Sequence, residues 1–317
     1  MFTVRQFSES ESDYNVLATI DSRLWQNHPV TADELRYREN NRDKKYWRKR
    51  IILEFNNNTA GYGSYGERDW AFVDGGFDFE ISVLPKYRRL GGGSILYEQI
   101  MDELYRKNPV KISSYSREDQ KDGMYFLEKR GYSRTLREPE SVIYPQEFNG
   151  EQFIHYIQKL NTQKIFFYSL NEIDKVVHNW KEKLYDIEWE ICQDIPFPDP
   201  PTKPPFGVWE KQTFDPGRFT PDTYFIAADG KNIVGVSCLK KVPADSKKMS
   251  TMLTGTAREY RRRGIATALK TACINAAKRM GVKEIMTDNE ENNPMYKLNL
   301  HLGFKPLPAW LHYEKTL

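Results

Sequence analysis

The sequence repeats itself at about half its own length. The segments FEISVLPKYRRLGGGSI and MLTGTAREYRRRGIAT share a strand-like run, a tyrosine, basic residues and then small residues; their tyrosines, Tyr87 and Tyr260, are 173 residues apart. Further on, FLEKRGY and LNLHLGF each end in glycine and an aromatic residue, and the glycines, Gly131 and Gly303, are 172 residues apart. Two landmarks with nearly one offset indicate a duplicated domain. We therefore expect two similar domains, joined near residues 145–160.

Length and composition agree with two globular domains. The chain has 317 residues, of which 39% are hydrophobic, 14% aromatic and 29% charged, which excludes a disordered tail, a collagen-like fibre and a small disulfide scaffold. The net charge of +3 is too small to indicate a protein built mainly to coat nucleic acid. Three widely separated cysteines, and the lack of an apolar run of about 20 residues, favour a cytoplasmic protein without a membrane span.

Both halves follow the same predicted order of elements, which is strand, loop, helix, strand, helix, strand. Apolar residues recur at helical spacing directly after each small-residue segment, and β-rich runs follow at residues 110–114 and 284–287. The pattern predicts a mixed α/β fold of two tandem domains, residues 1–145 and residues 146–317. Each is expected to be a central mixed sheet flanked by helices.

The repeated loop fits the pattern R-x-x-G-x-G/A and predicts an anion site in each half. A strand that ends in small residues and enters a helix leaves backbone N–H groups free at the positive end of the helix dipole, and such a loop can bind a pyrophosphate. Glycine lets phosphate oxygens approach the backbone, and arginines add charge-assisted contacts. The predicted ligands are Arg88, Arg89, Gly91, Gly92, Gly93 and Ser94 in the first half and Arg261, Arg262, Arg263, Gly264, Ile265, Ala266 and Thr267 in the second.

These motifs resemble the GNAT superfamily of acetyl-CoA-dependent N-acetyltransferases. The second half carries them most fully, in TGTAREYRRRGIAT and in the downstream asparagine-rich segment that ends in LGF. The tandem layout is similar to that of mycothiol synthase and related two-domain acetyltransferases. The resemblance implies two GNAT-like domains, acetyl-CoA (coenzyme A) as the cofactor, and direct transfer of the acetyl group to a primary amine of a small-molecule or peptide acceptor.

The resemblance also implies roles for single residues. The strand backbone near Thr256, and near Val83 in the first half, would bind the acetyl carbonyl, and Asn292 would contact the cofactor arm where the first half has Gln120. Many family members carry a catalytic tyrosine where this chain has Asn299 and, in the first half, a leucine. On this basis we expect the second domain to be catalytic and the first to be a degenerate copy that serves as a cofactor-binding or structural partner.

The missing tyrosine leaves the proton donor open. Tyr296 lies one turn before Asn299 on the same predicted helix face, so it is a candidate for the acid, although an ordinary packed tyrosine is the alternative. The same absence leaves a non-catalytic acyl-CoA-binding or scaffold protein as a second hypothesis. The histidines lack the spacing of metal ligands, so no metal is predicted, and Cys273 on an apolar stripe is expected to be a small hydrophobe. No oligomeric state is predicted.

Three further segments carry weaker signals. The basic run RDKKYWRKR, residues 42–50, is interpreted as a solvated helix face with two aromatic residues turned inward, and nucleic-acid binding is the alternative. The proline-rich segment at residues 196–205 is expected to be extended, either as a substrate-side loop or as a rigid spacer. A strand is predicted at residues 165–170, followed by a helix that is capped by Asn171 and runs toward Leu184.

Overall fold

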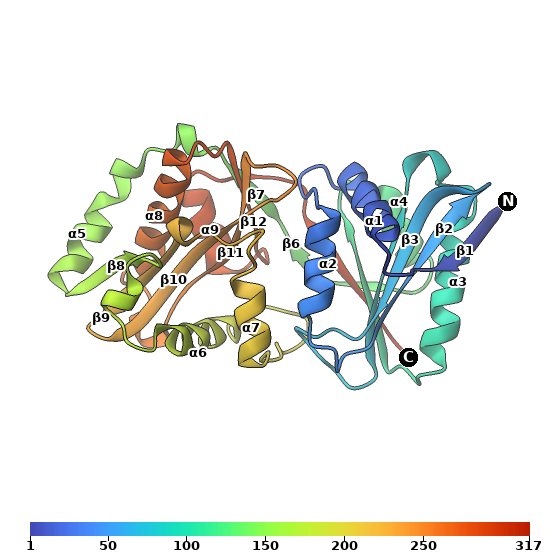
Figure 1. Ribbon diagram of the computed structural model, residues 1–317, viewed down its shortest axis with the longest axis horizontal. Coiled ribbons are helices and arrows are strands. Elements are labelled where there is room, and N and C mark those ends of the chain that lie inside the picture. The colour runs from blue at the N-terminus through green and yellow to red at the C-terminus, as the bar shows by residue number, and fades with distance from the viewer. The chain divides into compact units, whose positions relative to one another are not determined.

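The computed structural model describes residues 1–317 and divides the chain into two compact units. Unit 1 comprises Met1–Leu136, Pro198–Gln212 and Trp310–Leu317, and unit 2 comprises Arg137–Phe197 and Thr213–Ala309. Each unit contains one seven-stranded mixed sheet that carries helices (Figure 1). The predicted mixed α/β fold with two tandem domains is confirmed.

The sheet of unit 1 has the strand order β1-β2-β3-β4-β5-β14-β6. Its strands are β1 (Phe2–Gln6), β2 (Arg48–Phe55), β3 (Asn58–Gly66), β4 (Gly76–Val83), β5 (Lys111–Arg117), β6 (Ser133–Glu138) and β14 (Trp310–Thr316). The accompanying helices are α1 (Glu11–Leu24), α2 (Ala32–Asn41), α3 (Gly92–Tyr105), α4 (Lys121–Glu128) and α7 (Phe206–Thr213). Strands β1 to β4 form an antiparallel meander, and β4 pairs with β5 in parallel.

Helices α1 and α3 cover opposite faces of this sheet. Phe79 of β4 packs against Tyr97 of α3, with 5.6 Å between the ring centroids. The next residue, Glu80, contacts the hydroxyl group of Tyr62, which also contacts Asp21 of α1. Because successive strand residues point to opposite faces, the two helices lie on different sides of β4.

The sheet of unit 2 has the strand order β13-β7-β12-β11-β10-β9-β8. Its strands are β7 (Glu140–Ile143), β8 (Ile165–Ser169), β9 (Tyr224–Asp229), β10 (Asn232–Lys241), β11 (Lys248–Thr256), β12 (Glu284–Asp288) and β13 (Lys305–Pro306). The helices are α5 (Ile154–Thr162), α6 (Trp180–Cys192), α8 (Ile265–Arg279) and α9 (Pro294–His301). Helix α5 packs on α8, while α6 packs on β10 and β11 (Figure 1).

The two units exchange their last strands. The first five strands of each copy, β1 to β5 and β8 to β12, lie in the same order. However, β7, which follows β6 in the chain, lies beside β12 in unit 2, and β14, which follows β13, lies beside β5 in unit 1. The predicted division between residues 145 and 146 therefore differs from the units of the structure, which interleave along the chain. Strand pairing over long sequence separations is the physical reason, because no local pattern encodes it.

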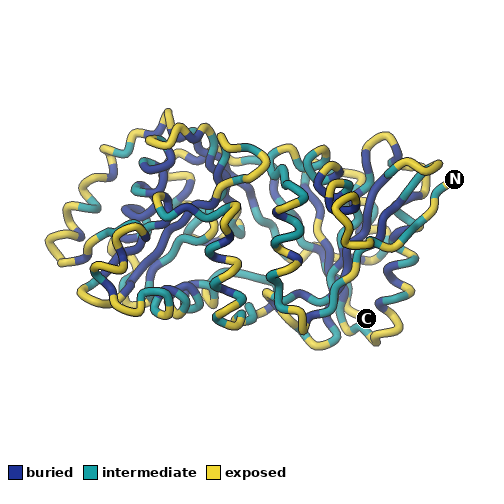
Figure 2. The backbone as a smooth tube through the Cα atoms, viewed as in Figure 1, coloured by how far each residue is buried: buried dark blue, intermediate teal, exposed yellow.

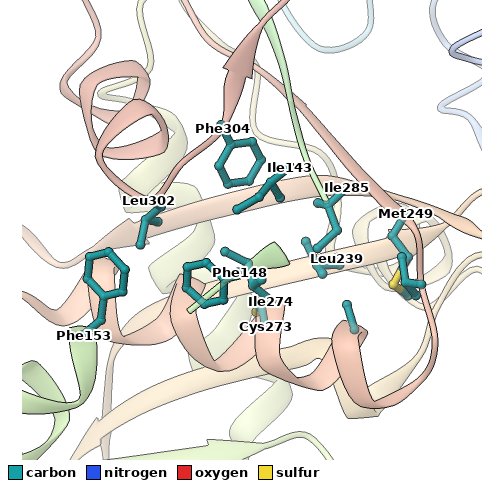
Figure 3. Packing of buried hydrophobic residues seen from close by; sticks show 12 residues of the cluster. Ile143, Phe148, Phe153, Leu239, Met249, Cys273, Ile274, Ile285, Leu302 and Phe304 are labelled. Carbon is teal, nitrogen blue, oxygen red and sulfur yellow. The ribbon is translucent and has the colours of Figure 1, made fainter. Parts of the chain in front are cut away.

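The exchanged strand β7 supplies part of the core of unit 2. Ile143 of β7 joins a buried apolar cluster that includes Ile285 of β12 and Phe304 near the end of α9 (Figure 3). Cys273 of α8 lies in the same cluster and is 1% exposed, as its apolar stripe predicts. In both units the buried residues follow the central strands, whereas the helices and loops carry most of the exposed ones (Figure 2).

The weaker predictions have mixed outcomes. The strand at residues 165–170 is confirmed as β8, but the helix predicted from Asn171 begins nine residues later, because α6 has Asn179 as its N-cap. The basic run at residues 42–50 is not a helix. It follows the end of α2 with a turn, and its last three residues are the first three of strand β2. Arg42, Lys44 and Arg50 gather around the buried carboxylate of Glu39, which explains the cluster of cations.

The proline-rich segment joins unit 1, although most of the second half lies in unit 2. Asp199 forms ion pairs with Arg68, at 2.5 Å, and with Lys111 of β5. The backbone N–H of Thr202 donates to the carbonyl of Trp70 at 2.8 Å, and its side-chain oxygen accepts from the N–H of Phe72 at 2.9 Å. The segment is thus bound to unit 1 by ion pairs and by hydrogen bonds to the backbone.

Candidate active site

The two anion-binding loops have nearly the same backbone conformation. Arg89 and Arg262 both have φ 61°, and the glycines at the helix N-caps have φ 95°, ψ −14° (Gly91) and φ 92°, ψ 6° (Gly264). No side chain caps the first turn of α3 or α8. The left-handed conformation explains the glycines, and the uncapped first turns present backbone N–H groups, as anion-binding loops do.

In both units a gap opens between two parallel strands just before this loop. Pairing of β4 with β5 ends at Asp78 and Ser113, although β4 continues for five more residues to Val83. Pairing of β11 with β12 likewise ends at Ser250, six residues before Thr256. The backbone groups of β4 and β11 that face the missing partner are left available to a ligand.

Val83 and Thr256 both direct their N–H groups into that gap. The N–H of the next residue, Leu84 or Ala257, donates to a carbonyl on the other neighbouring strand, at 2.9 Å in each unit. Because successive N–H groups of a strand point to opposite edges, those of Val83 and Thr256 point away from that neighbour. This is the orientation needed to donate to a carbonyl oxygen between the strands.

A cavity of about 730 Å³ occupies the gap in unit 1. Its lining includes residues from the loop, from the splayed strands and from both faces of the sheet. Among the residues predicted from sequence, Val83, Arg88, Arg89, Gly91, Gly93 and Ser94 line it, and so does Gln120, whose side-chain oxygen accepts from Arg88 at 3.1 Å. Gly92 is buried beneath the loop, beside Leu53 and Phe2. The structure therefore brings most of the first-half candidates together.

The loop end of the cavity is basic. Arg88, Arg89, Lys129 and Arg130 contribute to its lining. Arg130 stacks over the ring of Phe126, with 3.6 Å from its guanidinium carbon to the ring centroid, and donates to Ser94 Oγ at 2.9 Å. A flat, oriented guanidinium beside a glycine loop suits a phosphate-bearing ligand.

The other end of the cavity holds a carboxylate. Glu80 accepts hydrogen bonds from Tyr62 Oη at 2.6 Å, Ser82 Oγ at 3.0 Å and Tyr115 Oη at 3.1 Å. It forms no ion pair with a cationic side chain. Leu24 and Trp25, at the end of α1, complete the wall here. Three donors hold the carboxylate in place, and its charge also acts on the guanidinium of Arg48, which pairs with Asp78 at 3.9 Å.

Asp21 of α1 lies behind Glu80. Tyr62 Oη is 2.7 Å from Asp21 Oδ1, so the phenol contacts both carboxyl groups. Burial, together with the neighbouring charge of Glu80, raises the pKa of Asp21 to about 7. Burial and the charges of Glu80 and Asp21 also raise the pKa of Tyr62 well above its ordinary value. Tyr62 therefore keeps its proton near neutral pH, whereas Asp21 can exchange one.

The loop of unit 2 is covered by its own side chains. A Cβ placed on Gly264 would lie 2.3 Å from Cδ1 of Tyr156, on α5, whereas one placed on Gly91 would meet nothing within 4 Å. Asp194 forms ion pairs with Arg258, at 2.9 Å, and with Arg261. Hydrogen bonds from these two arginines lower the pKa of Asp194 to about 2. The positive charge of Arg261 is thus matched inside the unit, and a tyrosine ring covers the loop glycine.

The other second-half candidates lie on three segments of unit 2: helix α9, the turn before it, and the loop that leads into α8. Asn299 is 1% exposed, donates to Asn289 Oδ1 at 2.6 Å, and leaves its own Oδ1 without a partner. Tyr296 is half-buried on α9, and Asn292 is exposed and hydrogen-bonded to Glu290. In the loop, Arg261, Arg262 and Arg263 are exposed, Gly264 and Ala266 are half-buried, and Ile265 and Thr267 are buried. Their roles in binding and catalysis stay predictions.

Comparison with known families decides how these motifs are classified. The family model described as "Acetyltransferase (GNAT) family" matches residues 14–132 and again residues 181–304, which together span well over half of the chain. The chain belongs to the GNAT acetyltransferase family. Both matched regions contain one loop, one strand gap and the helix that follows, so the repeat seen in the sequence is a repeat of the GNAT domain.

Solved structures with the same two-domain fold are known. A GNAT protein from Sphaerobacter thermophilus is 16% identical, with a TM-score of 0.70, and the match covers 99% of this chain and 95% of that one. A tandem GNAT protein of the clavulanic acid biosynthesis pathway is 14% identical, with a TM-score of 0.73 and coverage of 100% and 98%. No curated protein matches the chain. At these identities the likeness concerns the fold, and it confirms the tandem GNAT layout.

Two general features complete the description. No helix combines the length and apolarity needed to cross a bilayer. No group of three or more His, Cys, Asp or Glu side chains is arranged to hold a metal ion.

Sequence reasoning missed the residues at the carboxylate end of the cavity. A signal existed for Glu80, because Phe79, Glu80, Ile81, Ser82 and Val83 alternate apolar and polar side chains in a strand otherwise expected to lie inside a sheet. Polar residues on one face of a central strand mark a functional surface or a hydrogen-bonded network. Asp21 and Tyr62 offered no such signal, because they meet Glu80 only through the tertiary fold.

Proposed function

We propose that the protein transfers an acetyl group from acetyl-CoA to a primary amine, and that unit 1 carries the reaction. The cavity that runs from the glycine loop to Glu80 supports this assignment most strongly. It joins an anion-binding end to a carboxylate end through the gap between β4 and β5. The proposal reverses the expectation from sequence, which favoured the second domain.

The residues at the loop end fit the cofactor. Gly91 leaves open space above the loop, and Arg88, Arg89 and Arg130 offer charge-assisted contacts to phosphate groups. Acetyl-CoA, when bound, supplies an acetyl group activated as a thioester. The N–H of Val83 is oriented to donate to the acetyl carbonyl, and one such donor commonly contributes about 3 kcal/mol to catalysis of acyl transfer.

Glu80 is proposed as the group that receives the proton of the amine. An alkylammonium has a pKa near 10.4, so attack requires that a base remove a proton. The carboxylate of Glu80 lines the cavity and forms no ion pair, and the cation that its charge acts on, Arg48, is paired with Asp78. It can therefore bind an ammonium group as a counter-ion and then accept its proton.

Unit 2 is proposed to be a structural partner without turnover. Its loop retains the backbone conformation of an anion site, but Tyr156 packs on Gly264 and Asp194 neutralises Arg261. Binding of a pyrophosphate there would require the ring to move and an ion pair to break. In unit 1 Asp122 pairs with Arg89 at 3.4 Å, but a Cβ placed on Gly91 would meet nothing within 4 Å.

The test is a panel of amines with acetyl-CoA, followed by release of the coenzyme A thiol. We expect turnover with at least one amine, and a loss of about 100-fold or more in Glu80→Gln, within the range typical of general base catalysis. Ser250→Ala, in unit 2, provides a control outside the proposed site. Cofactor binding without turnover of any amine would instead favour the non-catalytic acyl-CoA-binding protein that the missing tyrosine suggested.

A further inference from the structure

An aromatic wall borders the carboxylate end of the cavity. The ring of Trp25 lies 4.9 Å from that of Trp310, and Trp310 lies 5.5 Å from Tyr115. Trp25 and Tyr115, the two ends of this row, line the cavity together with Leu24. Tyr115 is 40% exposed and also donates to Glu80. An aromatic surface thus stands directly beside a carboxylate that forms no ion pair.

This pairing of surfaces fits one class of acceptor. Glu80 suits an ammonium group, and aromatic rings favour both cations and flat apolar groups. From this juxtaposition we infer that the acceptor is a monoamine with an aromatic arm, with its nitrogen at Glu80 and its arm against Trp25 and Tyr115. A polyamine would place a flexible chain rather than a flat ring against Trp25 and Tyr115, and an acidic amine would bring a carboxylate toward Glu80. This inference rests on the proposed function.

The inference is tested by comparing kcat/KM for phenethylamine, tryptamine, spermidine and glutamate. We expect the two aromatic amines to exceed the others by tenfold or more, a difference of about 1.4 kcal/mol. Trp25→Ala should reduce this preference, because it removes the arm's contact but leaves Glu80 in place. Preference for spermidine or glutamate in an active enzyme would overturn the inference alone. Absence of turnover with every amine would overturn the proposed function instead.

A second, independent observation concerns the proton count around Tyr62. Its hydroxyl group has one proton, yet it lies 2.7 Å from Asp21 and 2.6 Å from Glu80. When both carboxyl groups are ionised, only one of these contacts can be a hydrogen bond, and the other brings two oxygen lone pairs together. One additional proton on a carboxyl group satisfies both contacts. The three groups together therefore have a high affinity for one proton.

Asp21 is the better place for this additional proton. Glu80 receives two further hydrogen bonds, from Ser82 and Tyr115, which stabilise its ionised form. Tyr62 is the hydrogen-bonding partner of the Asp21 carboxyl group. The charged groups that act on Asp21 are Glu80, which raises its pKa, and Arg38 and Arg50, which lower it less than burial raises it. Both arginines also have acidic partners of their own, Glu34 and Glu39.

We propose that Asp21 is the store for the proton that Glu80 takes from the acceptor amine, and that Tyr62 connects the two. The ammonium N–H bond breaks and Glu80 gains the proton. Glu80 then passes a proton to the oxygen of Tyr62 while Tyr62 passes its own proton to ionised Asp21. The net result is a neutral amine, protonated Asp21 and a Glu80 carboxylate restored to its first state; Asp21 then returns its proton to solvent. This proposal rests on the proposed function, and Asp21 and Tyr62 act as positioning residues for Glu80.

Two measurements test the store. Carboxyl carbon NMR follows the titration of Asp21 without any substrate. We expect the pKa of Asp21 to be near neutral, and to stay raised in Tyr62→Phe, because burial and the charge of Glu80 remain while a hydrogen bond that lowers this pKa is lost. The second measurement is the pH dependence of kcat/KM with acetyl-CoA and phenethylamine, or whichever amine of the panel reacts fastest. We expect a rise through neutral pH that Asp21→Asn and Tyr62→Phe both lose, each with up to about 100-fold lower turnover.

The double variant and one control sharpen the result. Asp21→Asn combined with Tyr62→Phe should cost no more than either change alone, because both interrupt one path. Tyr115→Phe removes a hydrogen bond to the other oxygen of Glu80 and should keep the rise through neutral pH. Additive losses, or an Asp21 that titrates near 4 regardless of Tyr62, would overturn the store. An enzyme inactive with every amine would contradict the proposed function, whereas the NMR titration would still decide the proton sharing.

Discussion

The contrast between Gly91 and Gly264 can be tested by changing each to the same residue. Both glycines have left-handed backbones, so alanine at either position costs about 1–2 kcal/mol in strain. At Gly264 the new methyl group would also meet the ring of Tyr156 at 2.3 Å, and such overpacking typically costs a further 1–3 kcal/mol. At Gly91 it would meet nothing within 4 Å. Gly264→Ala should therefore be the more destabilising change.

Glutamate at the same positions separates stability from binding. A carboxylate about 4 Å from a phosphate, at an effective dielectric constant near 20, costs about 4 kcal/mol. That energy corresponds to a nearly 1000-fold weaker Kd for acetyl-CoA in Gly91→Glu. Gly264→Glu should change the Kd little, because we propose that the loop of unit 2 does not bind the cofactor. Its cost should appear in the melting temperature, since the larger side chain meets Tyr156.

Calorimetric titration with acetyl-CoA and thermal unfolding measure the two effects. A loss of about 3 kcal/mol in a unit of this size lowers the melting temperature by about 6–12 °C. If Gly264→Glu fails to fold, the same change in a Tyr156→Ala background removes the clash and keeps the experiment informative. A folded Gly264→Glu that loses cofactor binding, beside a Gly91→Glu that retains it, would refute the assignment of the reaction to unit 1.

Three further outcomes are expected. Acetyl-CoA at 100 times its Kd should stabilise the protein by about 2.7 kcal/mol, visible as a higher melting temperature; no shift and no heat of binding at millimolar cofactor would count against any acyl-CoA site. The pKa of Asp21 is raised in the fold, so its contribution to stability is present below about pH 4 and is lost as pH rises through about 7. Asp21→Asn should therefore be more stable than the wild type at pH 8.5 but not at pH 4. An equal gain at both pH values would contradict this sign. A chain cut between residues 145 and 146 should yield halves that are less stable than the intact chain, because each sheet loses the interior strand that the other half supplies. Halves as stable as the intact chain, in denaturant unfolding followed by circular dichroism, would contradict this.

Local features of the fold could be predicted because local sequence encodes them. The glycine loops, the helices that follow and the strands β5, β8 and β12 all arise from spacing or β-rich runs within a few residues. Val83 and the arginines Arg88 and Arg89 line one cavity for the same reason, since the strand and the loop are contiguous. The helix expected from Asn171 failed because a short 3₁₀ turn at Ile173–Lys175 takes up the first part of that segment.

The strand exchange and the carboxylate end of the cavity could not be predicted. Either β7 or β14 could complete either sheet by local β propensity, and pairing partners more than a hundred residues away decide the outcome. Asp21, Tyr62 and Glu80 come from α1, β3 and β4 and meet only when the sheet has formed. Nothing in the spacing of these residues indicates a shared proton.

The loop motif also explains why the more complete half is not the one we propose to be active. R-x-x-G-x-G/A describes a left-handed turn that starts a helix, and that turn is useful to the fold whether or not a ligand binds. Selection on the fold can therefore retain the motif in unit 2 while Tyr156 and Asp194 fill the space and match the charge that a pyrophosphate would need. These two residues lie 108 and 70 positions before Gly264, so a motif cannot register them. The side chains beside the loop help to distinguish an anion site from a helix start: a Cβ on Gly264 would meet Tyr156, whereas one on Gly91, which lines the cavity of unit 1, would meet nothing within 4 Å.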